Sequence, residues 1–366
     1  MKRLGLIINP MAGVGGSVAL KGSDGVYDEA QRRGAVPRAP ERTLRALHAL
    51  RSALSGVCVV TCTGRMGEAG ALTAGLTIET LIPVAEPTTA ADTRRAARAM
   101  AELGVDLLLF AGGDGTATDV HGAVDDRLPV VGVPAGVKMH SGVFAPTPEA
   151  AGALAAQYLG GQVSDTIRRE VMDIDEALLR AGVLAPRLLG SLLVPQVKSL
   201  LQRPKTRGTT EDALRRALGR AVMDELAPDA LVAVGPGTTA GAVMEIYGLP
   251  HTLLGFDLIR GGRLVAADVT ANDLLDCADD LHVVLAPIGG QGFLLGRGNQ
   301  QLTSAVLRRI NPSRVLIVAT TDRLAALQGQ PLLIDVDDPE IAATLTGKRR
   351  IITGPGRVAM YPVLRP

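Results

Sequence analysis

Short apolar runs alternate with amphipathic helical patterns along the first 160 residues. Apolar runs at residues 4–8, 57–61, 80–84, 107–110 and 128–134 predict buried strands. Helical spacing of apolar residues at 40–54, from about 66, 88–103 and 148–159 predicts helices between or after them. Strands that alternate with helices favour a doubly wound, mostly parallel sheet of the Rossmann type.

The pattern changes after residue 160. Polar and apolar positions alternate at 166–173 and on towards 194, which predicts antiparallel strands. Further strands are expected at 281–286, 315–320, 332–336 and 351–353, and a helix at 210–226. We therefore predict an α/β domain over residues 1–160 and a β-rich domain over 161–366. The second domain would contain an α/β unit near 210–260, and the C-terminal segment would either close it or pack back on the first.

The stretch DLLLFAGGDGTATDV, residues 106–120, combines a strand, a glycine loop and a helix expected from Ala117. Glycines let the backbone approach an anion, and the first N–H groups of a helix point at it. The stretch contains neither GxGxxG nor the GxxxxGK[ST] phosphate loop. The predicted phosphate-binding residues here are Gly112, Gly113, Gly115 and Thr116.

Asp114 places a carboxylate inside this loop. A carboxylate beside phosphates is unfavourable unless it holds a metal ion or takes a proton during a reaction. That cost favours a kinase over a passive nucleotide binder. The alternative is a tight turn in which Asp114 caps the helix.

Three further glycine-rich segments are candidate ligand loops. NPMAGVGG follows the first strand, AGVKMHSG follows the strand at 128–134, and PIGGQGF with GRGNQQ lies at 287–301. Asp24 is a candidate for a ribose or a metal ion, although a solvated turn explains it equally well. Arginine and amide side chains suit phosphate and base or sugar edges. The predicted binding residues are Asn9, Gly13, Gly15, Gly16, Asp24, Gly136, Lys138, Gly289, Gly290, Gln291, Arg297 and Asn299, with His140 as a polar contact.

A second copy of the central unit is visible in the sequence. DALVAVGPGTTAGAV, from Asp229, repeats the order of aspartate, apolar strand, glycine loop with threonine, and helix. Its loop has no carboxylate, so we expect phosphate binding by Gly235, Gly237, Thr238 and Thr239 without catalysis. A chance recurrence of common βαβ patterning is the alternative.

These motifs resemble the NAD kinase superfamily, which also includes diacylglycerol, sphingosine and phosphofructokinase-type enzymes. GGDGT and the NP-containing first loop carry the resemblance. VPAGVKMHSGVFA lacks the asparagine of the GxNxGxLGFL pattern typical of NAD kinases. It looks like the ATP-NAD kinase-like branch that includes acetoin-catabolism X proteins. Asp119 stands where the lipid kinases commonly have Asn-Glu.

The resemblance implies an ATP-dependent small-molecule kinase, with ATP or polyphosphate as the phosphoryl donor and NAD or a related metabolite as the acceptor. It implies that Asp114 is catalytic, as a general base or as a carboxylate near the metal. Mg²⁺ would be held through the phosphates, with Asp114 as the one candidate side chain, and Asp119 would belong to the nucleotide site. By analogy the protein forms a homo-oligomer.

Composition narrows the classes of partner. The formal net charge is +1 and aromatic residues are 2% of the chain, which argues against a nucleic-acid or anionic membrane surface. The three cysteines, Cys58, Cys62 and Cys277, form no CxxC pair, and no apolar run is long enough to span a membrane. We therefore expect a cytoplasmic protein. Two alternatives stay open: a diacylglycerol-type lipid kinase and a nucleotide-binding regulator without turnover.

Overall fold

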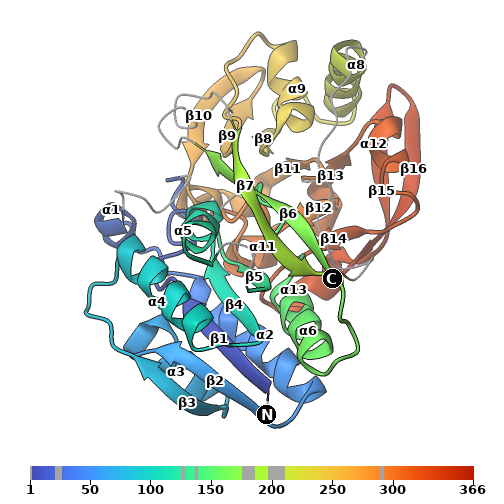
Figure 1. Cartoon of the computed structure of the whole chain (residues 1–366). Helices are drawn as coiled ribbons and strands as arrows, with labels where there is room; N and C mark the ends of the chain where they lie inside the picture. Colours follow the sequence, from blue (N-terminus) through green and yellow to red (C-terminus); the bar gives the residue numbers. More distant parts are fainter. Residues whose placement is uncertain are drawn as a thin grey trace. The chain divides into compact units, whose positions relative to one another are not determined.

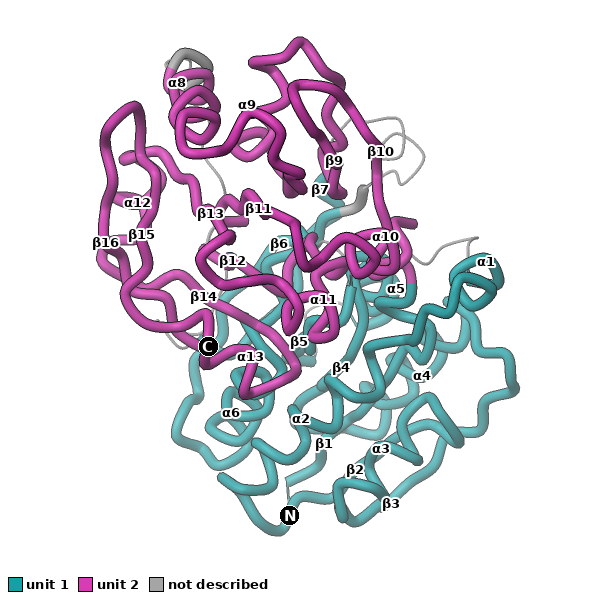
Figure 2. The backbone as a smooth tube through the Cα atoms, turned by 180° about the vertical axis from the view of Figure 1, so that it is seen from behind, with its two compact units in different colours: residues 1–14, 22–203 teal, residues 15–21, 204–366 magenta. Residues whose placement is uncertain are grey.

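The computed structural model describes residues 2–20, 27–124, 128–136, 139–174, 186–196, 211–288 and 292–366. Contacts divide the chain into two compact units (Figure 2). The first comprises residues 1–14 and 22–203, and the second comprises residues 15–21 and 204–366. The predicted domain boundary after residue 160 stays a prediction, while these contacts divide the units after residue 203.

A five-stranded parallel sheet forms the centre of the first unit (Figure 1). Its strands are β1 (Lys2–Ile8), β2 (Val57–Cys62), β3 (Thr77–Ile82), β4 (Leu107–Gly112) and β5 (Val130–Pro134). The order is β3-β2-β1-β4-β5, and every neighbouring pair is parallel. The strand order reverses between β1 and β4, which is where open α/β sheets bind ligands. The predicted doubly wound parallel sheet is confirmed.

Helices cover both faces of this sheet because alternate strand residues are apolar on both sides. Leu4, Leu6 and Ile8 of β1 share a core with α2, α3 and α6, while Ile7 shares the opposite core with α4 and α5. The helices are α1 (Tyr27–Arg32), α2 (Ala39–Ala53), α3 (Glu68–Thr73), α4 (Ala90–Glu102), α5 (Asp114–Val124) and α6 (Pro148–Leu159), with a short 3₁₀ turn at Gly64–Met66.

The helix predicted at 88–103 is α4, which begins at Ala90. Thr89 and Asp92 form a reciprocal capping box at the start of α4, which satisfies two N–H groups that the first turn leaves without helical partners. Thr147 caps α6 by accepting from the Ala150 N–H at 3.1 Å.

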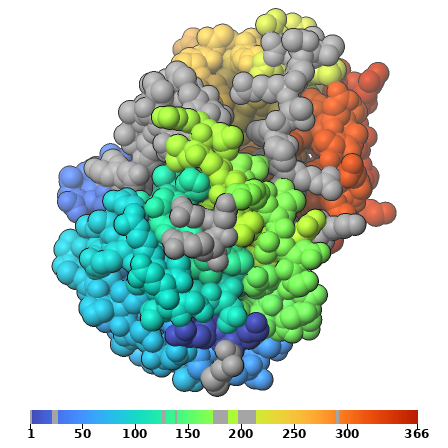
Figure 3. All heavy atoms as spheres, viewed as in Figure 1, coloured from blue at the N-terminus to red at the C-terminus, as the bar shows by residue number. Residues whose placement is uncertain are grey.

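An antiparallel hairpin completes the first unit. β6 (Thr166–Ile174) pairs with β7 (Pro186–Pro195), as the alternating pattern predicts. Val171, Leu192 and Val194 are buried in the core that also contains Val120 of α5. Atoms of the hairpin, in green, are visible on the face that Figure 3 shows.

The second unit contains a nine-stranded mixed sheet, ordered β10-β9-β8-β11-β13-β15-β16-β14-β12. β8, β11, β13 and β15 are parallel neighbours, and β14 lies parallel to β16 and β12. The strands are β8 (Leu231–Val234), β9 (Phe256–Arg260), β10 (Arg263–Val269), β11 (Leu281–Leu285), β12 (Phe293–Leu295), β13 (Val315–Val318), β14 (Leu332–Ile334), β15 (Gly347–Gly354) and β16 (Arg357–Leu364).

Six α-helices are described in the second unit. They are α8 (Glu211–Met223), α9 (Thr238–Ile246), α10 (Ala271–Asp276), α11 (Ser304–Arg309), α12 (Thr321–Ala325) and α13 (Pro339–Leu345), with 3₁₀ turns at Ala278–Asp280 and Pro312–Arg314. α8 and α9 share a core with one face of the sheet, and α10, α11 and α13 share a core with the other. The C-terminal strands pair within this sheet.

The repeated central unit is only a partial repeat in space. β4 and β5 are parallel across α5, whereas β8 and β9 are antiparallel across α9. The similarity of the two sequences therefore extends to strand, loop and helix but not to the following strand. Within the described residues, no helix is both long and apolar enough to cross a membrane.

Two helical glycines provide a test of packing in the first unit. A Cβ at Gly152 of α6 would lie 2.0 Å from the Ala46 carbonyl oxygen of α2, whereas a Cβ at Gly122 of α5 would meet no atom within 4 Å. We expect Gly152→Ala to lower the free energy of unfolding by about 2 kcal/mol, because the helices must separate. Gly122→Ala should raise it by up to about 1 kcal/mol through helix propensity.

Urea denaturation followed by circular dichroism measures both changes. Equal stability of the two variants would contradict the close packing of α2 and α6.

Candidate functional site

Three loops meet at the carboxyl ends of β1, β4 and β5 in the first unit. The Gly112 carbonyl oxygen accepts hydrogen bonds from the N–H groups of Ala135 (2.9 Å) and Gly136 (3.0 Å). A Cβ at Gly13 would lie 2.3 Å from the Ala135 carbonyl oxygen, and one at Gly136 would lie 2.8 Å from the Gly113 Cα. The loops therefore touch backbone to backbone, which only glycine permits at these positions.

Asn9 and Thr116 join the first of these loops to the second. The Asn9 side-chain amide donates to the Thr116 hydroxyl oxygen at 3.1 Å, and its carbonyl oxygen accepts from the Met11 N–H at 3.1 Å. A Cβ at Gly112 would lie 2.2 Å from the same hydroxyl oxygen. Both predicted phosphate-binding side chains thus shape the loops in this structure.

Helix α5 begins at Asp114, so the prediction of a start at Ala117 is wrong. The Gly113 carbonyl oxygen accepts from the Ala117 N–H at 3.0 Å, which places Asp114, Gly115 and Thr116 in the first turn. Within the described residues, the backbone N–H groups of these three make no hydrogen bond. Together with the helix dipole they form an anion-binding group of donors. Of the three glycines in the motif, Gly112 ends β4, Gly113 precedes the helix and Gly115 lies in its first turn.

The Asp114 carboxylate points at the loop that follows β5. Oδ2 accepts from the His140 N–H at 2.8 Å, and Oδ1 accepts from the Ser141 N–H at 2.9 Å. The His140 ring nitrogen Nδ1 lies 3.5 Å from Oδ2. The Asp114 side chain is 9% exposed and the His140 side chain is 20% exposed. A largely buried carboxylate that accepts two N–H groups is held firmly in one orientation.

Residues 140–142 are fixed on their other side by the hairpin. The fully buried Ser141 hydroxyl donates to the Met172 carbonyl oxygen at 3.3 Å and accepts from the Met172 N–H at 3.0 Å. The Gly142 N–H donates to the Glu170 carbonyl oxygen at 2.9 Å. The hairpin is therefore coupled through this segment to Asp114.

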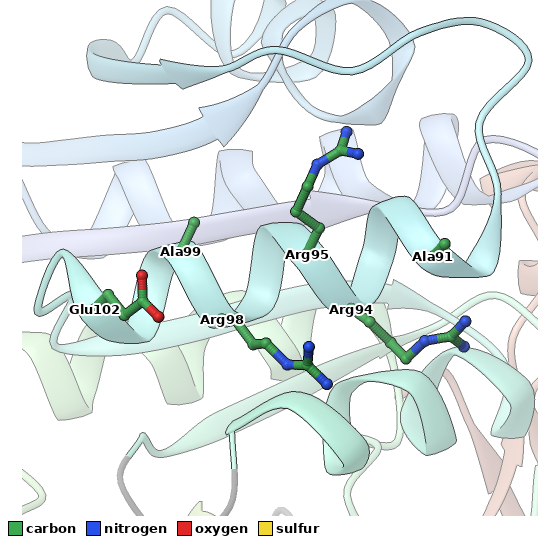
Figure 4. Close-up of a pocket in the computed structure, with 6 residues that line it drawn as sticks. All are labelled: Ala91, Arg94, Arg95, Arg98, Ala99 and Glu102. Atoms are coloured by element: carbon green, nitrogen blue, oxygen red, sulfur yellow. The ribbon is translucent and has the colours of Figure 1, made fainter.

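Asp119 lies away from these loops. Its carboxylate pairs with Arg94 of α4 and lies between α4 and α5. Figure 4 shows a shallow hollow lined by α4 residues, with Arg94 and Arg98 projecting from one side and Arg95 from the opposite side. The hollow includes none of the glycine loops. Its Arg95 is bonded to Asp92 at 2.8 Å, which makes it part of the α4 surface network.

Arg42 is a buried charge that the sequence analysis missed. The side chain is 2% exposed, and its Nε–H donates to the Pro134 carbonyl oxygen at the end of β5. It lies on the buried stripe of α2 with Ala46 and Leu50, four and eight residues later. In the sequence, an arginine at a position of the apolar stripe indicates a buried charge with a specific partner, because arginine is almost never fully buried without one.

The GPGTT segment forms a second helix start in the second unit. Gly235 donates to the Val284 carbonyl oxygen and Gly237 to that of Leu253, each at 3.0 Å. Gly237 has φ +95° and precedes α9, which begins at Thr238. Gly235, Gly237, Thr238 and Thr239 therefore lie together at the carboxyl ends of β8 and β11, and phosphate binding by them stays a prediction.

The GRGNQQ segment is a buried loop after β12. The Arg297 guanidinium lies 4.9 Å from the centre of the Phe293 ring. The Asn299 side chain accepts from the Gly296 N–H at 2.9 Å and donates to the Leu294 carbonyl oxygen at 2.8 Å, so it closes its own turn. Gly15 and Gly16 also belong to the second unit, where Gly16 packs against the Gln300 side chain.

Five predicted site residues lie outside the described part of the chain: Asp24, Lys138, Gly289, Gly290 and Gln291. Among the described residues, no group of three or more His, Cys, Asp or Glu side chains is arranged to hold a metal ion. The structure thus gathers Asp114, the glycines of three loops and His140 in the first unit. It locates the GPGTT and GRGNQQ groups in the second.

Two models of known protein families match separate parts of the chain. The ATP-NAD kinase N-terminal domain matches residues 4–163, and the ATP-NAD kinase C-terminal domain matches residues 231–363. No curated protein matches the chain.

Two solved structures from Bacillus anthracis str. Sterne, both of proteins designated as diacylglycerol kinases, are similar over part of the chain. One is 14% identical over 48% of this chain and 43% of its own, with a TM-score of 0.23. The other is 13% identical over 51% of this chain and 63% of its own, with a TM-score of 0.24. The chain thus spans about half the length of the solved structures it matches, and these TM-scores support no argument about activity.

The contact between Gly136 and Gly113 predicts a defect confined to the loops. A Cβ at position 136 must push the two backbones apart, so Gly136→Ala should weaken ATP binding about tenfold, or ~1.4 kcal/mol. Isothermal titration calorimetry measures the affinity, and Gly122→Ala, which meets no neighbour, is the matched control. Unchanged ATP affinity in Gly136→Ala would contradict a role for these loops in phosphate binding.

Burial of His251 predicts that acid destabilises the second unit. Its ring lies 3.4 Å from the Gly235 carbonyl oxygen, and burial lowers its pKa below the usual 6.5. The unfolded chain then binds more protons than the folded chain, so the free energy of unfolding falls as the pH drops below about 6.5. Burial, with the nearby Arg314 charge, also lowers the pKa of His282.

Urea midpoints at pH 7.5 and 5.0 measure this effect. His251→Gln and His282→Gln should each lose less stability between these pH values than the wild type. A wild type that is more stable at the lower pH would refute this assignment.

Proposed function

The chain belongs to the ATP-NAD kinase family, and from this membership we propose that it transfers a phosphoryl group from ATP to a hydroxyl of NAD or a related metabolite. The identity of the acceptor is proposed along with the reaction. Polyphosphate is the alternative donor, because loop amides and a helix start bind any chain of phosphates. The product with NAD would be NADP.

The observation that supports a kinase best is the position of Asp114. The side chain starts from the same first turn of α5 whose three N–H groups make no hydrogen bond to the described residues. Phosphoryl transfer needs a group of donors for the phosphates and a basic group near the attacking hydroxyl. Candidates for both lie within three consecutive residues, Asp114 to Thr116.

The loops provide electrostatic stabilisation without side-chain movement. The first-turn N–H groups of α5 are oriented before a ligand arrives, because the preceding Gly112 is fixed by its hydrogen bonds from Ala135 and Gly136. Such preorganised donors stabilise charge that develops on a transferring group. The buried Arg42 adds a positive charge at the end of β5.

The described residues do not form a preformed cage for Mg²⁺. Both Asp114 oxygens accept N–H groups, and the Glu170 carboxylate lies against Gly142 of the loop after β5, but the described residues form no group of three or more metal ligands. Mg²⁺ commonly binds proteins through substrate phosphates and one or two carboxylates. We therefore propose that the ion enters with the nucleotide, where it neutralises phosphate charge.

A nucleotide-binding regulator without turnover is the second candidate. The two N–H bonds to Asp114 favour it, because they give the carboxylate a structural task that needs no chemistry. A regulator would bind ATP and transfer nothing. A homo-oligomer is proposed by analogy only, and light scattering of the purified protein measures it.

Asp114→Asn provides the main test of the proposed function. The variant should lose about 10²- to 10⁴-fold in kcat for NADP formation, because an amide can neither take a proton nor orient a base. Its stability should also fall by about 1–3 kcal/mol, since the amide NH₂ cannot accept one of the two N–H groups. The assay follows NADP with Mg²⁺ and either ATP or polyphosphate.

Ser141→Ala is the control for this loss of stability. It removes the hydrogen bonds to Met172 but keeps the carboxylate, so it should retain most of the kcat. Near-normal turnover in Asp114→Asn, or ATP binding without transfer in the wild type, would favour the regulator.

A further inference from the structure

His140 and Asp114 form a pair within the first unit. The imidazole Nδ1 lies 3.5 Å from Asp114 Oδ2, the oxygen that also accepts the His140 backbone N–H. Nδ1 is buried and makes no hydrogen bond within the described structure. A buried ring nitrogen without a partner is costly unless a small movement satisfies it. The Asp114 carboxylate is within reach of such a movement.

The carboxylate is less accessible than the ring. Asp114 is 9% exposed and each of its oxygens already accepts a backbone N–H, whereas His140 is 20% exposed. A substrate hydroxyl approaching Asp114 directly would compete with the two bonds that hold residues 140 and 141. The second imidazole nitrogen, Nε2, makes no hydrogen bond or ion pair with the described residues.

Hydrogen bonds fix the main chain of residues 140 and 141, from which the imidazole ring projects. The N–H of His140 is bonded to Asp114, and the next residue, Ser141, is bonded to both Asp114 and Met172. Only the two side-chain torsions of His140 stay adjustable, so a shift of a few tenths of an ångström brings Nδ1 to hydrogen-bond distance. Such contacts are often long before substrate binds and then tighten.

We propose that His140 is the catalytic base of the phosphoryl transfer and that Asp114 acts behind it as the positioning carboxylate. This inference rests on the proposed kinase function. The Nδ1–H tautomer directed at Asp114 leaves the lone pair on Nε2 for the acceptor hydroxyl. Carboxylate–imidazole pairs of this kind orient the base and stabilise the imidazolium that forms.

The transfer forms one bond to phosphorus, breaks another and moves one proton. The acceptor O–H bond breaks and its proton moves to Nε2, while the oxygen forms a bond to the γ-phosphorus of ATP. The bond from that phosphorus to the bridging oxygen breaks, and ADP leaves with the electron pair. The imidazolium, next to the Asp114 carboxylate, then returns its proton to solvent.

His140→Ala with added imidazole tests this role. We expect kcat for NADP formation to fall about 10²- to 10⁴-fold with the KM for ATP within about threefold of the wild type. Free imidazole should restore at least tenfold of the lost rate, while thiazole, a ring of similar size and much weaker basicity, should not. His48→Ala, an exposed histidine on α2, is the matched control and should keep the wild-type rate.

The outcomes separate this inference from the proposed function. Wild-type turnover with undiminished kcat in His140→Ala overturns the base assignment and leaves the kinase intact. Equal restoration of the rate by thiazole also overturns the base assignment, since filling the space left by the ring would then be sufficient. A wild-type chain that releases no ADP with NAD or any other hydroxyl acceptor overturns both proposals. His140→Gln, which keeps the volume without the basic nitrogen, should behave as His140→Ala if the variant with alanine folds poorly.

Discussion

The site depends on one buried carboxylate that accepts two backbone N–H groups. Asp114 joins the first turn of α5 to residues 140 and 141, and Ser141 continues the connection to β6. Three elements that are distant in the chain thereby hold one another in place. Because the interaction is charge-assisted and shielded from water, it is among the stronger single contacts that a loop can make.

Backbone contact between the loops explains why they are rich in glycine. Gly13, Gly112 and Gly136 lie where a Cβ would overlap a neighbouring main-chain or threonine atom. The loops can therefore stack at the reversal point of the strand order, where the ends of β1, β4 and β5 converge. The same stacking orients the first-turn N–H groups of α5, so the fold and the predicted phosphate chemistry depend on the same glycines.

Several polar residues that resemble ligand contacts have structural tasks in the described chain. Asn9 bonds to Thr116 and Met11, Asn299 closes its own turn, and Asp119 pairs with Arg94. Amide and carboxylate groups bind a phosphate or sugar and a neighbouring backbone group by the same hydrogen bonds. A sequence shows the chemistry of such a group, and only the folded chain shows which partner it has.

The sequence by itself determined the doubly wound sheet, the helix that forms α4 and the hairpin, because these follow from local periodicity. It did not determine that α5 begins at Asp114, that β9 runs antiparallel to β8, or that His140 faces the carboxylate. Arg42 likewise gave only a weak signal, a charge within an apolar stripe. The direction of β9 and the places of His140 and Arg42 depend on contacts between residues about 25 to more than 90 positions apart, or on the path of a connection, and local patterns contain no information about either. The start of α5 rests on a local bond between Ala117 and Gly113, but glycines at such a place suit a loop equally well.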